Sequence, residues 1–353
     1  MRRRAILLFT ATAAVLLLAS GTALAALKIG TDGPDTLIGT SSADQITGGK
    51  GNDTLKGLAG NDVYYFADGW GSDTLEEPRK IGKKSGGSDT LSFSWTTTGV
   101  DVYLIPQWGS DWNWVTDHNG NVVALGNSVV ENVTGGMGWD RIYGGGERNT
   151  LQPGGGLNEI SDYGGWKDGA LGRPGLPASN DVFKGFENTG NNRVYDWGGT
   201  ADVLDMRPFS SSEVYVDALD LDSNGTKESL QIVYRNSTGA TVQVLVVGHF
   251  GAYSYFTSDS GQQGRIEQLV FSDGTFSGES EVGSGTASAS AASSEEASAN
   301  DTVEGLISAS KERAKTTKEG AELENAAKKL LKEAQKEAPE DPLAQPPEGE
   351  KGR

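Results

Sequence analysis

The sequence predicts an all-β protein built around a solenoid, and three observations lead to this fold class. Residues 30–65 form four consecutive nine-residue units, GTDGPDTLI, GTSSADQIT, GGKGNDTLK and GLAGNDVYY. A period this short indicates turns that stack on one another to bury a continuous core. The later chain alternates apolar and polar residues between turn sequences, and glycine supplies 50 of all 353 residues.

Residues 1–25 have the features of a Sec-type secretory signal peptide. Arginines at 2–4 precede an apolar run over residues 5–19, and small residues at 23–25 suit a cleavage site. The apolar run is shorter than the roughly 20 residues that a membrane-spanning helix needs. We therefore predict a secreted, extracellular protein without an integral membrane segment after cleavage, and retention as an anchor is the alternative.

Each unit of the repeat combines a loop with a short strand. Its first six residues are rich in glycine, asparagine and aspartate, which favour tight turns. Its last three form a strand whose central side chain points to one face, because side chains alternate along a strand. The apolar ladder expected from stacked units consists of Leu37, Ile46, Leu55 and Tyr64.

Aspartate occupies the sixth position of all four units. Stacked carboxylates about 4 Å apart would repel by about 4 kcal/mol at an effective dielectric near 20, so the repeat needs a cation between its loops. Calcium suits such loops because it takes about 6–8 oxygen ligands in flexible geometry, including carboxylates and backbone carbonyls. A metal-free turn is the alternative for any single unit.

The repeat resembles the RTX, or haemolysin-type, calcium-binding repeat. The third unit matches the consensus G-G-x-G-x-D-x-U-x through Gly48, Gly49, Gly51, Asp53 and Leu55. The resemblance implies a parallel β-roll, a two-sheet solenoid in which two units make one turn. It also implies several calcium ions, each lying between one loop and the loop two units later.

The resemblance assigns partners to the aspartates of residues 26–92, the expected calcium-binding β-roll. It pairs Asp35 with Asp53 and Asp44 with Asp62. Looser copies of the unit, at longer intervals, add Asp73 opposite Asp53 and Asp89 opposite Asp62. The expected metal-binding residues of this block are Asp35, Asp44, Gly48, Gly49, Gly51, Asp53, Gly57, Gly60, Asp62, Asp73 and Asp89.

Residues 93–134 are predicted to be a tryptophan-rich β insertion or cap. Alternating segments at 100–104 and 122–125 predict strands, with a turn at Asn119-Gly120. The intervening loop contains Trp108, Trp112 and Trp114. Such clusters more often plug a β core than stack on a sugar, although both functions remain open.

Residues 135–162 form a second, degenerate repeat block. Three units keep the nine-residue step and the apolar eighth position. Their sixth positions are Asp140, Asn149 and Asn158. Because asparagine lowers the ligand charge and hence calcium affinity, we expect a mainly structural roll with at most one weak site, at Asp140.

Residues 163–284 are predicted to be a C-terminal β cap region. The expected strands are 214–216, 230–234, 241–247 and 266–271, with a turn at Asp273-Gly274. Segments 198–204 and 266–275 resemble the C-terminal ends of RTX domains, which implies that this region closes the open edge of the roll.

Asp220, Asp222 and Asn224 begin a D-x-[DN]-x-[DN]-G loop like that of an EF-hand. The motif needs glutamate at its twelfth position, where this chain has Gln231, and strands flank the loop. The loop is a candidate for one further calcium ion, and a hairpin turn is the alternative.

Residues 285–353 are predicted to be a low-complexity linker followed by a charged amphipathic helix, so that the tail beyond the roll is disordered or helical. Apolar residues recur at helical spacing between Leu323 and Ala334. The helix is expected from Asp301, which with Glu304 resembles a capping pair, to about Ala338.

The composition argues against several function classes. A net charge of −18 disfavours nucleic acid and anionic membranes as partners. The chain has no cysteine, and its two histidines, His118 and His249, form no H-E-x-x-H zinc pair. It also lacks a G-x-S-x-G nucleophile motif. We therefore predict no catalytic residues, no cofactor other than calcium, and no enzymatic activity.

The predicted function is that of a secreted calcium-binding RTX-type protein whose folding is coupled to extracellular calcium. One alternative is a calcium-dependent adhesin or surface-layer component that self-associates. Another is a carbohydrate-binding protein or, less favoured, a carbohydrate-active enzyme whose carboxylates the sequence does not reveal. A cell-surface or extracellular glycan or protein is the further partner class.

Overall fold

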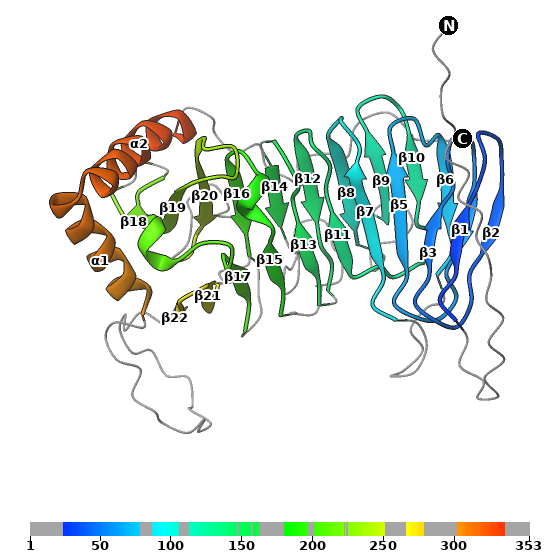
Figure 1. The fold of residues 1–353 in the computed structure, drawn as a ribbon, viewed down its shortest axis with the longest axis horizontal. Helices are drawn as coiled ribbons and strands as arrows, with labels where there is room; N and C mark the ends of the chain where they lie inside the picture. Colours follow the sequence, from blue (N-terminus) through cyan, green and yellow to red (C-terminus); the bar gives the residue numbers. More distant parts are fainter. Residues whose placement is uncertain are drawn as a thin grey trace, which may run out of the picture.

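The structure is a computed structural model that describes residues 24–77, 87–105, 113–146, 148–156, 158–161, 180–196, 201–221, 223, 225–250, 266–278 and 302–335. Two sheets lie face to face, and the chain passes from one to the other in turns that stack along the long axis of the molecule (Figure 1). The predicted signal segment up to residue 23 and the linker at 279–301 lie outside the described residues.

The ten-stranded sheet is parallel except for a terminal hairpin. In spatial order its strands are β1 (Leu27–Ile29), β3 (Gln45–Thr47), β5 (Val63–Ala67), β7 (Thr90–Trp95), β11 (Asn132–Thr134), β13 (Thr150–Gln152), β15 (Val182–Lys184), β17 (Val203–Asp205), β21 (Gln268–Phe271) and β22 (Gly274–Ser277).

The twelve-stranded sheet accommodates an inserted hairpin, β9–β10, between β6 and β8. In spatial order its strands are β2 (Thr36–Ile38), β4 (Thr54–Lys56), β6 (Ser72–Leu75), β10 (Val122–Ala124), β9 (Asn113–Asp117), β8 (Val100–Leu104), β12 (Asp140–Tyr143), β14 (Asn158–Ser161), β16 (Asn192–Tyr195), β20 (Thr241–Val247), β19 (Ser229–Arg235) and β18 (Tyr215–Leu219).

The register of the first turns follows the sequence repeat. Leu37 pairs with Leu55 in one sheet, and Ile46 pairs with Tyr64 in the other. Ile46, Leu55 and Tyr64 are completely buried between the sheets, whereas Leu37, in the first turn, is partly buried. Two units therefore make one turn, and the all-β, parallel β-roll expected from the repeat is confirmed.

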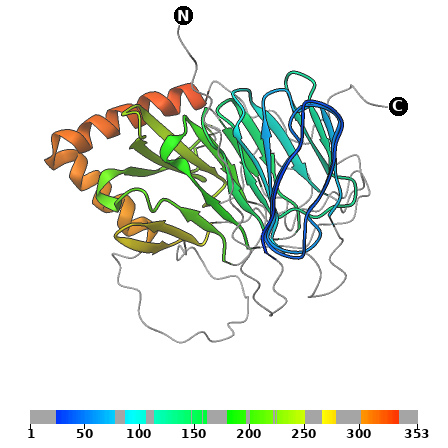
Figure 2. The same cartoon turned by 45° about the vertical axis from the view of Figure 1, so that its right-hand side comes forward.

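A pair of helices covers the C-terminal end of the roll. Helices α1 (Val303–Thr316) and α2 (Lys318–Ala334) pack on β18, β19 and β20. Figure 2 shows these orange helices at the opposite end of the molecule from the dark blue first turn. Among the described residues, no helix is long and apolar enough to cross a bilayer.

The single helix predicted from Asp301 onward is wrong in two respects. The structure breaks it at Thr317, whose hydroxyl accepts a hydrogen bond from the Gly320 N–H (3.0 Å) and starts α2. The first helix is capped by Thr302, whose hydroxyl accepts the Gly305 N–H (3.1 Å), and Asp301 lies outside the described residues. A Cβ at Gly320 would collide with the backbone of α1, so glycine permits the tight turn between the helices.

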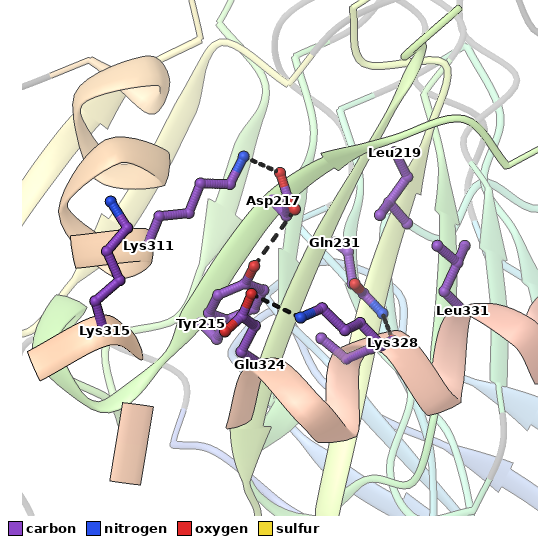
Figure 3. A pocket seen from close by; sticks show the side chains of 10 residues that line it. Tyr215, Asp217, Leu219, Gln231, Lys311, Lys315, Glu324, Lys328 and Leu331 are labelled. Atoms are coloured by element: carbon purple, nitrogen blue, oxygen red, sulfur yellow. Dashed lines mark hydrogen bonds and ion pairs between the residues drawn. The ribbon is translucent and has the colours of Figure 1, made fainter. Parts of the chain in front are cut away.

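The helical tail is docked on the twelve-stranded sheet. Ser310 bonds to both the N–H and the C=O of Val216, and Gln231 donates to the carbonyl of Ala327. A cavity of about 250 Å³ remains between helices and sheet, where Lys311 pairs with Asp217 (2.6 Å; Figure 3). The apolar positions of α2 that pack against the sheet are Leu323, Ala327, Leu330 and Ala334.

Candidate metal centre

The repeat loops lie in two rows along the roll. Loops of the first row run from the ten-stranded to the twelve-stranded sheet, and loops of the second row run back. The first row carries Asp35, Asp53 and Asp73, and the second carries Asp44, Asp62 and Asp89. The structure thus gathers six of the sequence-predicted site residues into two columns.

A repeating hydrogen bond connects the members of each column. The backbone N–H of one aspartate donates to the carboxylate of the aspartate one turn later. The four bonds run from Asp35 to Asp53 Oδ1 (2.8 Å), from Asp53 to Asp73 Oδ1 (2.9 Å), from Asp44 to Asp62 Oδ1 (2.7 Å) and from Asp62 to Asp89 Oδ1 (2.9 Å). Each bond uses one carboxylate oxygen and fixes the orientation of the other.

The second oxygen is buried without a hydrogen-bond partner at three of these positions. Within the described part of the chain, Oδ2 of Asp53, Asp62 and Asp73 accepts no bond, although these residues are at most 2% exposed. A buried polar group without a partner costs about 1–3 kcal/mol, and more when it is charged. A hard cation held by these oxygens removes that cost, so the donor set fits calcium.

Glycines keep the space beside the carboxylates free of side chains. A Cβ at Gly48 would collide with Oδ2 of Asp53, and a Cβ at Gly57 would collide with Oδ2 of Asp62. Other loop glycines adopt positive φ, which residues with a side chain disfavour. These are Gly49 (+96°), Gly51 (+128°) and Gly60 (+128°).

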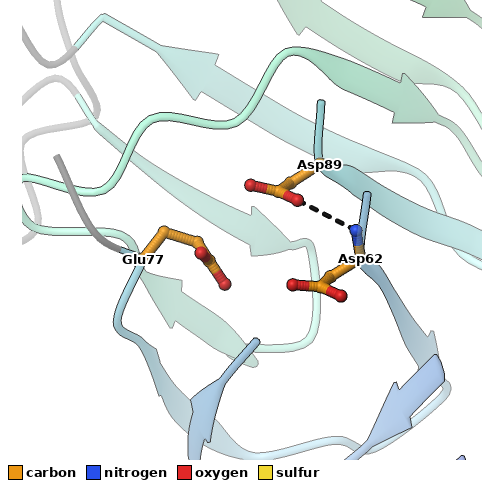
Figure 4. Close-up of side chains that lie close together, drawn as sticks. All are labelled: Asp62, Glu77 and Asp89. Carbon is orange, nitrogen blue, oxygen red and sulfur yellow. Dashed lines mark hydrogen bonds between the residues drawn. The ribbon is translucent and has the colours of Figure 1, made fainter. Parts of the chain in front are cut away.

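Glu77 belongs to the second column, and the sequence analysis missed it. Oxygen atoms of Asp62, Glu77 and Asp89 lie within 4.8 Å of one another (Figure 4). The Gly57 N–H donates to Glu77 Oε1 (3.0 Å), while Oε2 is buried without a partner. The available signal was an acidic residue just after strand-ending Leu75, at a loop position where the preceding turn has glycine.

The pKa values of these carboxyl groups rise along the roll. At its N-terminal end, hydrogen bonds from the N–H and hydroxyl of Thr31 lower the pKa of Asp35. Burial raises the pKa of Asp53, and it raises the pKa of Asp73 to about 7. Burial, followed by nearby carboxylates, raises the pKa of Glu77 to about 8. The inner turns therefore hold negative charge only at a cost unless a cation compensates it.

The second repeat block satisfies its polar groups internally. Asp140 accepts the Val100 N–H at Oδ1 (2.8 Å) and the Gly136 N–H at Oδ2 (3.0 Å), and burial raises its pKa to about 8. Asn158 accepts the Asp140 N–H (3.0 Å) and donates to Asn192 Oδ1 (2.9 Å). Asp140 and Asn158 therefore have protein partners where the first block leaves oxygens unpartnered.

Other residues singled out from the sequence lie away from the two acidic columns. Asp220 accepts the Gly225 N–H (2.8 Å) in the β18–β19 hairpin, and Asp222 and Asn224 are outside the described residues. Of the tryptophan cluster only Trp114 is described, and its ring stacks on Tyr103 at 4.8 Å.

The two histidines also lie apart from the columns. His118 is half exposed, with Nε2 3.7 Å from Asp101 Oδ1. His249 is buried against Phe250. Neither histidine is among the residues that form the candidate metal centre.

Comparison with protein families identifies the repeats. The model of the RTX calcium-binding nonapeptide repeat matches residues 29–64 and 132–156, with four copies. These segments are RTX repeats. The matches fall on both repeat blocks, including the one in which asparagine replaces aspartate.

Beyond the repeat family, similarity is found among solved structures. No curated protein matches it in sequence. Among solved structures it is similar to the solution structure of a subunit of the mannuronan C5-epimerase from Azotobacter vinelandii, at 17% identity over 75% of this chain and 94% of that one. The TM-score is 0.17, too low to support an inference about function.

Proposed function

We propose that this protein is a secreted, non-catalytic scaffold whose RTX roll folds around calcium ions. The unpartnered buried carboxylate oxygens in the two loop rows are the observation that carries this proposal. Secretion is supported by the signal-like composition of residues 1–25.

Calcium ligands are assigned by loop row. Carboxylates of the first row bind between successive turns, and those of the second row do so together with Glu77. The loop glycines leave room for backbone carbonyls to complete the ligand set. The proposed carboxylate ligands are Asp35, Asp53 and Asp73 in one row and Asp44, Asp62, Glu77 and Asp89 in the other.

Calcium binding and folding are coupled in this proposal. When calcium is scarce, the carboxylates of each column either repel one another or take up protons. The folded state of the first turns is then only weakly stable. Millimolar calcium outside the cell neutralises the columns and favours the folded roll. Each site adds about 2.7 kcal/mol when free calcium is 100 times its dissociation constant.

Thermal unfolding followed by circular dichroism tests the proposal on the chain without residues 1–25. We expect a higher midpoint and more β signal in millimolar calcium than in EDTA, and a smaller effect from magnesium, which demands a stricter geometry. Asp53→Asn should remove part of the calcium effect, whereas Asp140→Asn, from the internally bonded block, should leave most of it. Equal midpoints in calcium and EDTA would refute the proposal.

A further inference from the structure

The second loop row continues beyond the RTX repeats, toward the C-terminal end of the roll. Asp181 directly precedes β15, Asp202 directly precedes β17, and Glu267 directly precedes β21. The Asp181 N–H donates to Asp202 Oδ1 (2.6 Å), and the Asp202 N–H donates to Glu267 Oε2 (2.7 Å). The backbone-to-carboxylate bond of the repeats thus recurs where no repeat is matched.

Asp196 also lies in this part of the second loop row, at the first position of its loop. It directly follows β16, and the parallel register of β12, β14 and β16 places it in the column of Gly144, the first residue of a repeat unit. Glu77 takes the same position one turn after Gly57, whose N–H it binds. Both acids therefore replace the glycine that begins a second-row loop.

Two sets of four carboxylates, or quartets, consequently share the same loop positions and backbone hydrogen bonds, although among the described residues only Asp62, Glu77 and Asp89 have oxygen atoms within 4.8 Å of one another. One consists of Asp62, Glu77, Asp89 and Glu131, and the other of Asp181, Asp196, Asp202 and Glu267. In the first quartet, the Asp62 N–H binds Asp89 Oδ1 (2.9 Å) and the Asp89 N–H binds Glu131 Oε2 (2.8 Å). The bonds of Asp181 and Asp202 described above repeat this arrangement in the second quartet.

Asp202 shows that the second quartet is more than a group of neighbouring acids. Its side chain is completely buried, and within the described residues Oδ2 has no hydrogen-bond partner. Asp181 and Asp196 are also buried, at 0% and 3% exposure. Burial, reinforced by the charges of Asp196, Glu267 and Asp181, raises the pKa of Asp202 to about 9. A completely buried carboxyl group with one unpartnered oxygen, such as that of Asp202, is stabilised by a proton or by a cation.

We propose that Asp181, Asp196, Asp202 and Glu267 bind one calcium ion outside the RTX repeats. The all-oxygen, multiply anionic donor set favours calcium over softer metals. Glu267 leads into the β21–β22 hairpin, and Ser277 of that hairpin bridges to Thr302 beside α1. The ion therefore fastens the C-terminal cap to the roll. This site does not depend on occupancy of the repeats.

The number of calcium ions bound per chain, measured by equilibrium dialysis, tests the proposal. Asp202→Asn keeps an oxygen for the Asp181 N–H but loses the negative charge, and it should bind one ion fewer than wild type. Asp205→Asn is the matched control, because Asp205 lies at the other end of β17 and its carboxylate already pairs with Arg207. It should bind as many ions as wild type. An unchanged count in Asp202→Asn overturns the inference.

A second measurement covers the case in which Asp202→Asn does not fold. In a chain carrying Asp53→Asn and Asp62→Asn, calcium should still slow hydrogen exchange in β17 and β21. Absence of that slowing contradicts the inference. If the repeat variants bind fewer ions and Asp202→Asn binds as many as wild type, the site at Asp202 is refuted and the repeat sites stand. If Asp202→Asn binds fewer ions and the repeat variants bind as many as wild type, the repeat sites are refuted and the site at Asp202 stands.

Discussion

The two repeat blocks share a fold but differ in how the polar side chains of their loops find hydrogen-bond partners. In both, the apolar eighth position is buried between parallel strands, as Leu55 and Leu151 are. In the first block, Asp53 and Asp62 at the sixth position each leave one buried carboxylate oxygen without a partner among the described residues, whereas both oxygens of Asp44 accept backbone N–H groups. In the second block, Asn149 and Asn158 use both amide groups, since Asn149 accepts from Gly145 and donates to the Glu131 carbonyl. Periodicity therefore suffices for the roll, and a turn needs a cation where the carboxylate at its sixth position keeps an oxygen without a protein partner.

The difference follows from the two functional groups. An amide presents one donor and one acceptor, so a column of asparagines can complete its own hydrogen bonds. An ionised carboxylate only accepts. Once the backbone N–H of the preceding turn has bound one oxygen, the other oxygen requires a donor or a metal ion.

Replacing an asparagine of the second block by aspartate, as in the first block, should have the largest effect on stability. Asn158→Asp removes the donor to Asn192 and adds a buried negative charge next to Asp140. In EDTA we expect a loss of about 3–5 kcal/mol in the free energy of unfolding, the usual cost of an uncompensated buried charge. Urea denaturation measures it. A loss below about 1 kcal/mol would show that the second block tolerates charge without a metal.

Removing one carboxylate of the Asp62, Glu77 and Asp89 cluster should have the next largest effect. Glu77→Gln keeps an acceptor for the Gly57 N–H but weakens calcium binding. At saturating calcium we expect about 2–3 kcal/mol less stability than wild type, the contribution of one well-occupied site. In EDTA the variant should match or exceed wild type. Equal losses in both conditions would indicate a purely structural Glu77.

Filling the glycine space should act on the same cluster by sterics. Gly57→Ala would place a Cβ against Asp62 and Glu77, with an expected loss of about 1–3 kcal/mol. Gly33→Ala is the matched control, because its Cβ would meet only the Thr31 hydroxyl, at 3.9 Å. Calcium titration should show weakened binding for Gly57→Ala and unchanged binding for Gly33→Ala. Identical titrations of the two variants would contradict the assigned loop.

The pH dependence of the calcium-free chain should be the smallest effect. Burial raises the pKa of Asp73 from 3.8 to about 7 and that of Glu77 from 4.5 to about 8. The folded chain keeps these protons after the unfolded chain has lost them, so stability falls as pH rises through this interval. The two groups together contribute at most about 2.7 kcal/mol per pH unit, and solvent screening reduces this, so we expect a loss of about 1 kcal/mol per pH unit between pH 5 and pH 7 in EDTA. Denaturation at each pH measures the slope, and a rise in stability over this interval would contradict it.

Much of the roll could be predicted because its information is local and periodic. The nine-residue step, together with the two units per turn that the RTX resemblance implies, puts Asp53 beside Asp35 and Leu55 beside Leu37, as the register shows. Residues in loops that differ in length from the nine-residue unit could not be placed in this way. Glu77 lies 12 positions before Asp89 in the sequence, and only stacking on the preceding turn brings it to Asp62.

The helical tail shows the other limit of sequence reasoning. Spacing of apolar residues identified the buried face of α2, including Leu323 and Leu330. The break at Thr317 depends on how closely Gly320 approaches α1. Docking of α1 on the sheet depends on the backbone N–H and C=O of Val216, which lies in a strand almost 100 residues earlier. Such contacts between distant segments leave no periodic trace.

Hydrogen exchange resolved along the chain, in millimolar calcium and in EDTA, tests the central claim most directly. If calcium acts where buried carboxylate oxygens lack protein partners, it should slow exchange strongly in strands β2 to β7 and weakly in β12 to β14. Equal slowing in both blocks, or none in the first, would contradict the account.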